Sequence, residues 1–147
     1  MIEPESDPAP KAKRAKSTSP TKRTLAECRK RGYVVQVVER WNPHAKVRVD
    51  LFGVIDLLAI VPLSPTDALV PPIGGEPSGI LAIQACAGDS HAARRDKILA
   101  ETRAKQWVDA GGQLELWSWS VRGAAGKAKR WTLRVETYAQ MRAAVTT

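Results

Sequence analysis

The spacing of apolar and polar positions along this chain predicts short strands mixed with amphipathic helices. The first helix is expected to begin after Ser19, a good cap, with Pro20 in the first turn, where its missing N–H costs nothing. Its narrow apolar stripe consists of Thr21, Leu25 and Cys28. Gly32 supplies a left-handed stop, so this helix should end near residue 31.

Five later segments are β-branched or apolar and short enough to be strands: 33–39, 47–60, 80–87, 114–121 and 131–136. The longest is 47–60, in which Gly53 is expected to form a bulge or bend. The segment 80–87 is almost continuously apolar, as in a buried central strand. The tetrapeptide 41–44 (WNPH) is expected to be a turn, and 122–130 a basic, glycine-rich hairpin loop.

Two more helices complete the pattern. One is expected from about His91 to Ala110, capped by Asp89 or Ser90 and ended by glycines, and a short one over 138–145. The order α-β-β-β-α-β-β-α favours an α/β fold, with a central four- to five-stranded mixed sheet flanked by helices on both faces. We expect a single domain over 20–147, a disordered basic tail over 1–19, and a Pro/Gly-rich surface loop over 62–79.

Charge and length narrow the class of protein. The chain has 147 residues, 23 Lys plus Arg against 15 Asp plus Glu, and a net charge of +8, which favours a polyanionic partner such as nucleic acid. No apolar run is long enough for a membrane span, and the N-terminus does not have the pattern of a secretory signal. Two distant cysteines are typical of a reducing compartment, so we expect a cytoplasmic, non-secreted protein.

Asp56 is the residue that most strongly suggests chemistry. It lies in the apolar segment GVIDLLAI, where a carboxylate must be paired, hydrogen-bonded or bound to a metal. Gln84 interrupts the next buried strand in the same way. A carboxylate and an amide oxygen on adjacent strands can share a divalent cation. A purely structural hydrogen bond of Asp56 remains the alternative, and Asp50 competes for the acidic role if the strand is regular.

These segments, in this order, resemble the PD-(D/E)xK nuclease superfamily, most closely its small Holliday-junction-resolvase-like and phage nuclease-like members. The resemblance covers residues from about 20 to 121: a helix carrying Glu27, then GVIDLLAI with Asp56 at the motif aspartate, then LAIQAC, a helix and LELWSW. Gln84 matches a tolerated variant of the second acidic position. Cys86 stands where the superfamily has lysine, which is a departure.

The resemblance implies a restriction-endonuclease-like core and metal-dependent hydrolysis of phosphodiester bonds in a prokaryotic or phage-infected cell. It implies that Mg²⁺ or Mn²⁺ is held by Asp56, the side-chain oxygen of Gln84 and the carbonyl of Ala85, with Glu27 completing the site. Glu27 could instead pair with a neighbouring arginine of its helix. Lys97 is the candidate to replace the missing lysine, unless it lies on a solvated helix surface.

Two basic clusters are candidates for contacts with DNA phosphates. Arg94 and Arg95 open the helix after the motif strand, and Lys127, Lys129 and Arg130 belong to the hairpin loop. Trp117 and Trp119 share a strand face and could stack on bases, although tryptophans more often fill a core. Cys28, Cys86, His44 and His91 have no spacing typical of zinc ligands.

The leading hypothesis is therefore a small Mg²⁺-dependent DNA endonuclease, structure-selective in the manner of a junction resolvase. The first alternative is a catalytically weak or inactive nucleic-acid-binding module on the same fold, indicated by Cys86. The second is an α/β interaction protein whose basic surface meets an acidic partner. Cutting a four-way junction would require a homodimer, because two strands need two active sites.

Overall fold

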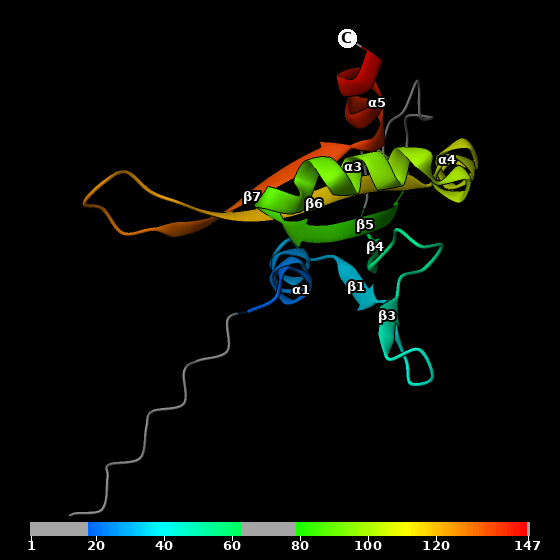
Figure 1. Cartoon of the computed structure of the whole chain (residues 1–147), viewed down its shortest axis with the longest axis horizontal. Coiled ribbons are helices and arrows are strands. Elements are labelled where there is room, and N and C mark those ends of the chain that lie inside the picture. Colours follow the sequence, from blue (N-terminus) through cyan, green and yellow to red (C-terminus); the bar gives the residue numbers. More distant parts are fainter. Residues whose placement is uncertain (1–17, 63–78, 147) are drawn as a thin grey trace, which may run out of the picture.

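The computed structural model describes residues 18–62 and 79–146 (Figure 1). Its helices are α1 (Pro20–Lys30), α3 (His91–Ala100), α4 (Thr102–Asp109) and α5 (Tyr138–Thr146), with a 3₁₀ turn η1 (Gly88–Ser90) before α3. Its strands are β1 (Val34–Val37), β2 (Arg40–Asn42), β3 (Val47–Val49), β4 (Leu57–Ile60), β5 (Ile80–Ala87), β6 (Gln113–Arg122) and β7 (Arg130–Thr137). The predicted tail over 1–19 and loop over 62–79 lie almost entirely outside the described residues.

A five-stranded sheet in the order β1-β4-β5-β6-β7 forms the centre of the protein. β5 and β6 are parallel and are joined through α3 and α4, whereas the other neighbouring pairs are antiparallel. The predicted α/β class with a mixed central sheet is confirmed. No helix in residues 18–62 or 79–146 is long and apolar enough to cross a membrane.

Helices pack on both faces of this sheet, as predicted. On one face Cys28 of α1 packs with Leu57, Ile83 and Trp117. On the other face α3, α4 and α5 contribute buried side chains to a second core with β5 and β6; these are Ile98, Ala104 and Met141. Along β5 and β6, even-numbered side chains therefore lie on the α3 face of the sheet and odd-numbered ones on the α1 face.

The beginning and end of α1 follow the predicted signals. The Ser19 hydroxyl accepts a hydrogen bond from the Lys22 amide, and Gly32 adopts the left-handed conformation with φ +81°. Cys28 is buried and Leu25 packs against the same core, as the predicted stripe requires, but Thr24 is buried instead of Thr21.

The predicted strand over 47–60 is wrong as a single element. β3 pairs with β2 in a separate two-stranded ribbon, whereas β4 belongs to the central sheet. Between them Phe52 and Gly53 both have positive φ, of 52° and 77°, and the Ile55 amide donates back to the Leu51 carbonyl. Gly53 therefore does mark a bend, but the bend reverses the chain. The predicted turn at 41–44 also shifts, because Trp41 and Asn42 lie in β2.

The helix predicted over 91–110 is divided into two. Glu101 leaves the helical region with φ −84° and ψ 112°, and its side chain accepts from the Arg103 amide to cap α4. Ser90 occupies the cap position of α3 without a side-chain capping bond.

Candidate metal centre and basic surface

Asp56 lies directly before β4 and is fixed by backbone hydrogen bonds on two sides. Its amide donates to the Ile83 carbonyl at 3.0 Å, and its carbonyl accepts from the Val38 amide at 2.8 Å. Its carboxylate accepts from the Gln84 Nε2 at 2.5 Å and from the Ala85 amide at 2.9 Å. The predicted juxtaposition of Asp56 and Gln84 on neighbouring segments of one sheet face is therefore what the structure has.

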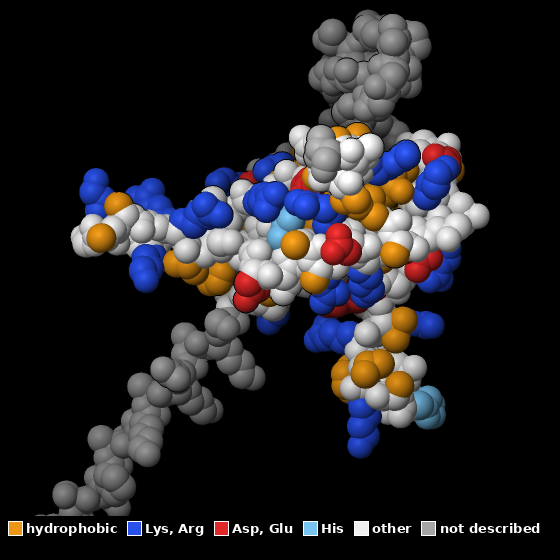
Figure 2. All heavy atoms as spheres, turned by 45° about the horizontal axis from the view of Figure 1, so that its top comes forward, with side chains coloured by type: hydrophobic (Ala, Val, Ile, Leu, Met, Phe, Trp, Pro, Cys, Tyr) orange, Lys and Arg blue, Asp and Glu red, His pale blue; other side chains and the backbone are white. Residues whose placement is uncertain are grey.

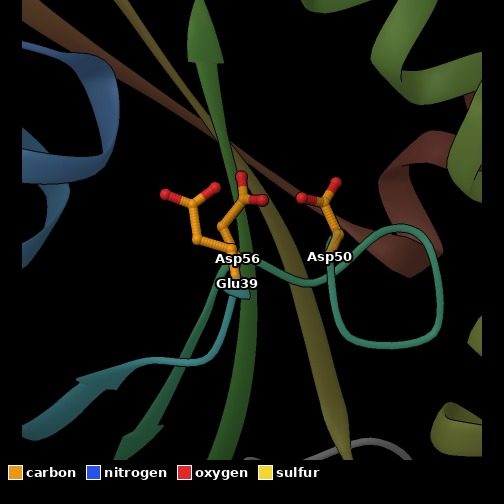
Figure 3. Close-up of side chains that lie close together, drawn as sticks. All are labelled: Glu39, Asp50 and Asp56. Atoms are coloured by element: carbon orange, nitrogen blue, oxygen red, sulfur yellow. The ribbon is translucent and has the colours of Figure 1, made fainter. Parts of the chain in front are cut away.

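Three carboxylates meet at this point, and we call them the acidic cluster: Glu39, Asp50 and Asp56. One oxygen of each lies within 4.8 Å of one oxygen of the others (Figure 3). Glu39 comes directly before β2, and Asp50 directly after β3. Asp50 and Asp56 were rivals on the assumption of one regular strand, but the turn between them brings both into one cluster.

Sequence reasoning missed Glu39, because it was read as the last residue of a β-branched strand. The signal that would have found it is the pairing of strands. β1 is antiparallel to β4 with Val37 opposite Leu57, so the residues just after β1 must lie beside those just before β4. Knowledge of that register, which the sequence does not contain, puts Glu39 beside Asp56.

Burial and crowding alter the chemistry of Asp56. Burial raises the pKa of its carboxyl from 3.8 to about 7; the Ala85 amide opposes this shift, and the neighbouring Asp50 and Glu39 add to it. Asp56 is only 4% exposed. The neighbouring negative charges therefore act with burial to disfavour the ionised form of Asp56.

The donors around Asp56 fit a hard divalent cation. The side-chain oxygen of Gln84, which is 1% exposed, has no hydrogen-bond partner among the described residues. The Ala85 amide points toward Asp56, and the carbonyl of a strand residue points to the same side as its amide. Together with the acidic cluster, these oxygens form the donor set that Mg²⁺ or Mn²⁺ prefers.

The acidic cluster opens into a cavity of about 410 Å³ that also receives three cations, Arg48, Arg94 and Lys97. Lys97 Nζ lies 3.9 Å from an Asp50 oxygen, and the Arg48 guanidinium donates to Glu39 at 2.8 Å. Lys97 is therefore brought to the site, as the resemblance suggested, and the side chain of Arg94 lines the same cavity. Cys86 also lines it, and burial raises the pKa of its thiol to about 11, so this residue is neutral.

Glu27 departs from its predicted role as a metal ligand. Its carboxylate accepts a hydrogen bond from Arg31 at 3.1 Å, one turn along α1, and it does not line the cavity. The ion pair within the helix, weighed as the alternative, is what the structure has. Glu39 occupies the place beside Asp56 that Glu27 was expected to take.

Arg95 departs from its predicted role in binding phosphate. Its guanidinium donates to the buried Glu136 at 2.9 Å, and Glu136 also contacts the His91 Nε2 at 2.5 Å. The other His91 nitrogen lies 2.7 Å from the Ser118 hydroxyl. A Ser–His–Glu series suggests a nucleophile, but Ser118 is 1% exposed. This network therefore anchors the start of α3 to β6 and β7.

Lys127, Lys129 and Arg130, which we call the hairpin cations, are all exposed. They lie where β6 and β7 extend as a ribbon well beyond the helices, and Figure 2 shows Lys and Arg side chains gathered along it. By contrast, Trp117 and Trp119 are 0% and 9% exposed. Both belong to the core, so the stacking alternative is wrong for them.

The residues considered for zinc do not come together. Cys28 and Cys86 are free and belong to cores on opposite faces of the sheet, while His91 is held by Ser118 and Glu136. Comparison of the whole chain with protein-family models, curated proteins and solved structures finds no match. The geometry of the site therefore carries the functional interpretation.

Proposed function

We propose that this protein is a metal-dependent DNA endonuclease with a restriction-endonuclease-like core. The observation that carries the proposal is the acidic cluster beside the side-chain oxygen of Gln84, which has no hydrogen-bond partner among the described residues, in a cavity that cationic side chains also line. Metal-assisted hydrolysis of a phosphodiester has two requirements: carboxylates that hold a divalent cation, and nearby side chains that attract the phosphate.

Mg²⁺ or Mn²⁺ would be held by the acidic cluster, with the side-chain oxygen of Gln84 and the carbonyl of Ala85 available to complete its coordination. Once bound, the cation would polarise a phosphate and lower the pKa of a water molecule. Asp56 is the central ligand, because backbone and side-chain donors fix its carboxylate in one orientation. Glu39 and Asp50 lie on opposite sides of it (Figure 3).

The two cations of α3 supply the charge that a phosphate needs. Lys97 and Arg94 both line the cavity, and Lys97 already lies within ion-pair distance of Asp50. A cation there would orient the scissile phosphate and stabilise charge that develops on it. Lys97 thus takes over the role of the amine that Cys86 does not have.

The arrangement of elements supports the same assignment. The chain runs through a helix, three antiparallel strands, a helical crossover and a parallel strand, which is the order in which the resemblance matches the superfamily. The second candidate is a nucleic-acid-binding module without catalysis, and the neutral Cys86 favours it. A homodimer, required for cutting both strands of a junction, remains a prediction.

A nicking assay on supercoiled plasmid with Mg²⁺ or Mn²⁺ tests the proposal. We expect Asp56→Asn to abolish nicking while binding of the plasmid persists, and Lys97→Ala to reduce the rate at least ten-fold. Glu27→Gln is the matched control, because this acid does not line the cavity and pairs with Arg31 within its own helix. Wild-type protein that binds but never cuts duplex, nicked, flapped or four-way DNA would leave the binding module as the function.

A further inference from the structure

A second polar cavity, of about 300 Å³, lies on the α3 side of the ribbon formed by β6 and β7. Its floor is made by neighbouring cross-strand pairs, Ser118 with Arg134 and Ser120 with Thr132. Arg122 lies further along β6 and also lines it. Two guanidinium groups and several hydroxyls therefore face one concave space.

The wall of this cavity is formed by backbone at the end of β5. A Cβ added to Gly88 would lie 1.8 Å from the Ser120 hydroxyl oxygen, so only glycine allows η1 to approach the floor this closely. Ala87 and Ser90, on either side of Gly88 and Asp89, line the acidic cavity instead. The two cavities are therefore separated by the short segment that begins α3.

Among the described residues, the charge in the second cavity is compensated only in part, because Arg134 lies within ion-pair distance of Glu136 and Arg122 forms no ion pair. Glu136, the acid beneath it, is already bonded to His91 and Arg95, and Arg134 lies 3.7 Å from the same oxygen. Within the part of the chain that the structure describes, the side chains of Arg122, Ser120 and Thr132 form no hydrogen bond or ion pair. Proteins recognise phosphate with such a combination of charged and neutral hydrogen-bond donors.

We propose that this cavity binds one phosphate of the nucleic-acid backbone, next to the phosphate that reaches the acidic cluster. Arg122 and Arg134 would neutralise it, and the hydroxyls of Ser120 and Thr132 would donate to its oxygens. The inference rests on the proposed nucleic-acid substrate but not on cleavage. This contact, at the base of the β6–β7 ribbon, would fix where the nucleic-acid strand enters the metal centre.

The decisive measurement is the salt dependence of duplex binding by the full chain in EDTA, which excludes cleavage. Arg122→Gln and Arg134→Gln should each weaken binding by about ten-fold, because each removes a charged hydrogen bond to phosphate. Since both contact one phosphate, the double variant should flatten the log–log slope by about 0.9 rather than about 1.8. Thr132→Val should weaken binding without changing the slope.

Matched controls make this result specific. Arg142→Gln removes the same charge from an exposed position on α5, and Thr102→Val removes a hydroxyl from an exposed position on α4; neither should change affinity or slope. A slope that the double variant leaves unchanged, or a loss equal to that of Arg142→Gln, overturns the proposal. A variant that has lost its fold would be recognised by an altered urea midpoint, and Thr132→Val then provides the test.

A second measurement separates backbone phosphate from free phosphate. Titration with inorganic phosphate should shift the backbone amide resonances of Ser120 and Thr132 in the wild type but not in the double variant. If phosphate shifts these resonances but the double variant binds duplex DNA as the wild type does, the cavity is a site for free phosphate and the proposal is overturned. Persistence of the slope effect in a protein that never nicks DNA would support the cavity while refuting the endonuclease.

Discussion

Replacing Asp56 by Asn in metal-free protein should stabilise the fold above pH 7, and this is the sharpest test of the acidic cluster. The carboxyl of Asp56 has its pKa raised to about 7 in the folded protein, against 3.8 without these surroundings. Between these values the native state binds a proton that the unfolded chain has lost. Wild-type stability must therefore decrease as pH rises through this interval, whereas Asn, which cannot ionise, avoids the loss.

The magnitude follows from the same two values. Each pH unit in the interval costs about 1.4 kcal/mol, so three units cost about 4 kcal/mol by pH 8. Little of this is relieved by solvent, because Asp56 is 4% exposed and its neighbours Asp50 and Glu39 carry the same sign of charge. Asn keeps an oxygen for the Ala85 amide, so the substitution removes charge with little loss of hydrogen bonding.

Urea unfolding in EDTA between pH 4 and 9, followed by tryptophan fluorescence, to which the buried Trp117 contributes, measures the effect. The two proteins should be equally stable near pH 4 and diverge by up to about 4 kcal/mol at pH 8. Asp96→Asn, an exposed change on α3, should run parallel to the wild type. If the stability of Asp56→Asn also runs parallel to that of the wild type, the Asp56 carboxyl is not buried beside the other two acids.

Adding Mg²⁺ or Mn²⁺ should remove most of the difference in stability between the two proteins at pH 8. A cation at one hundred times its dissociation constant stabilises a single-site protein by about 3 kcal/mol, and Asp56→Asn would gain little of this. The apparent affinity should increase as pH rises through about 7, because the cation displaces the proton that Asp56 otherwise keeps. Equal stabilisation of both proteins would place the cation elsewhere.

Three further changes test the surroundings of this site. Cys86→Lys should raise the Mg²⁺-dependent nicking rate about ten-fold, because it projects an amine toward the same cavity; an unchanged rate would mean that Lys97 already suffices. Neutralising all three hairpin cations should flatten the salt slope of duplex binding by about 2–3, and an unchanged slope would assign the ribbon tip to solvent. Glu136→Gln should lower stability at pH 7 by about 2 kcal/mol. Because the pKa of Glu136 is lowered by the hydrogen bonds from His91 and Arg95, which outweigh its burial, urea unfolding should find this deficit shrinking below about pH 4.

Local signals in the sequence were sufficient where neighbouring residues decide the structure. Ser19 and Gly32 bound the first helix because a cap and a left-handed stop act within one turn. Asp56 and Gln84 were correctly brought together because each is a polar side chain in an apolar strand, and such strands pair. Alternation alone also put Gln84 and Cys86 on one face of their strand.

Signals failed where distant parts of the chain decide. The segment 47–60 has the composition of one strand, but Phe52 and Gly53 reverse it, and no local pattern says that β3 and β4 belong to different sheets. His91 and Glu136 are 45 residues apart, so nothing in the sequence predicted that Arg95 would be drawn into their network and away from phosphate. The missing information in each case is the register between elements.

The acidic cluster is unfavourable for the stability of the fold, and this supports the metal site that we propose. Glu39, Asp50 and Asp56 come from three separate segments, and packing them together raises the free energy of the folded protein, in keeping with the raised pKa of Asp56. Apolar residues in their place would make the folded protein more stable, since burying like charges raises its free energy. Arg48 and Lys97 relieve part of this repulsion, but both are largely exposed and attract the carboxylates only weakly. The side-chain oxygen of Gln84, which has no hydrogen-bond partner in residues 18–62 and 79–146, adds to this cost, and the cation that we propose would relieve both.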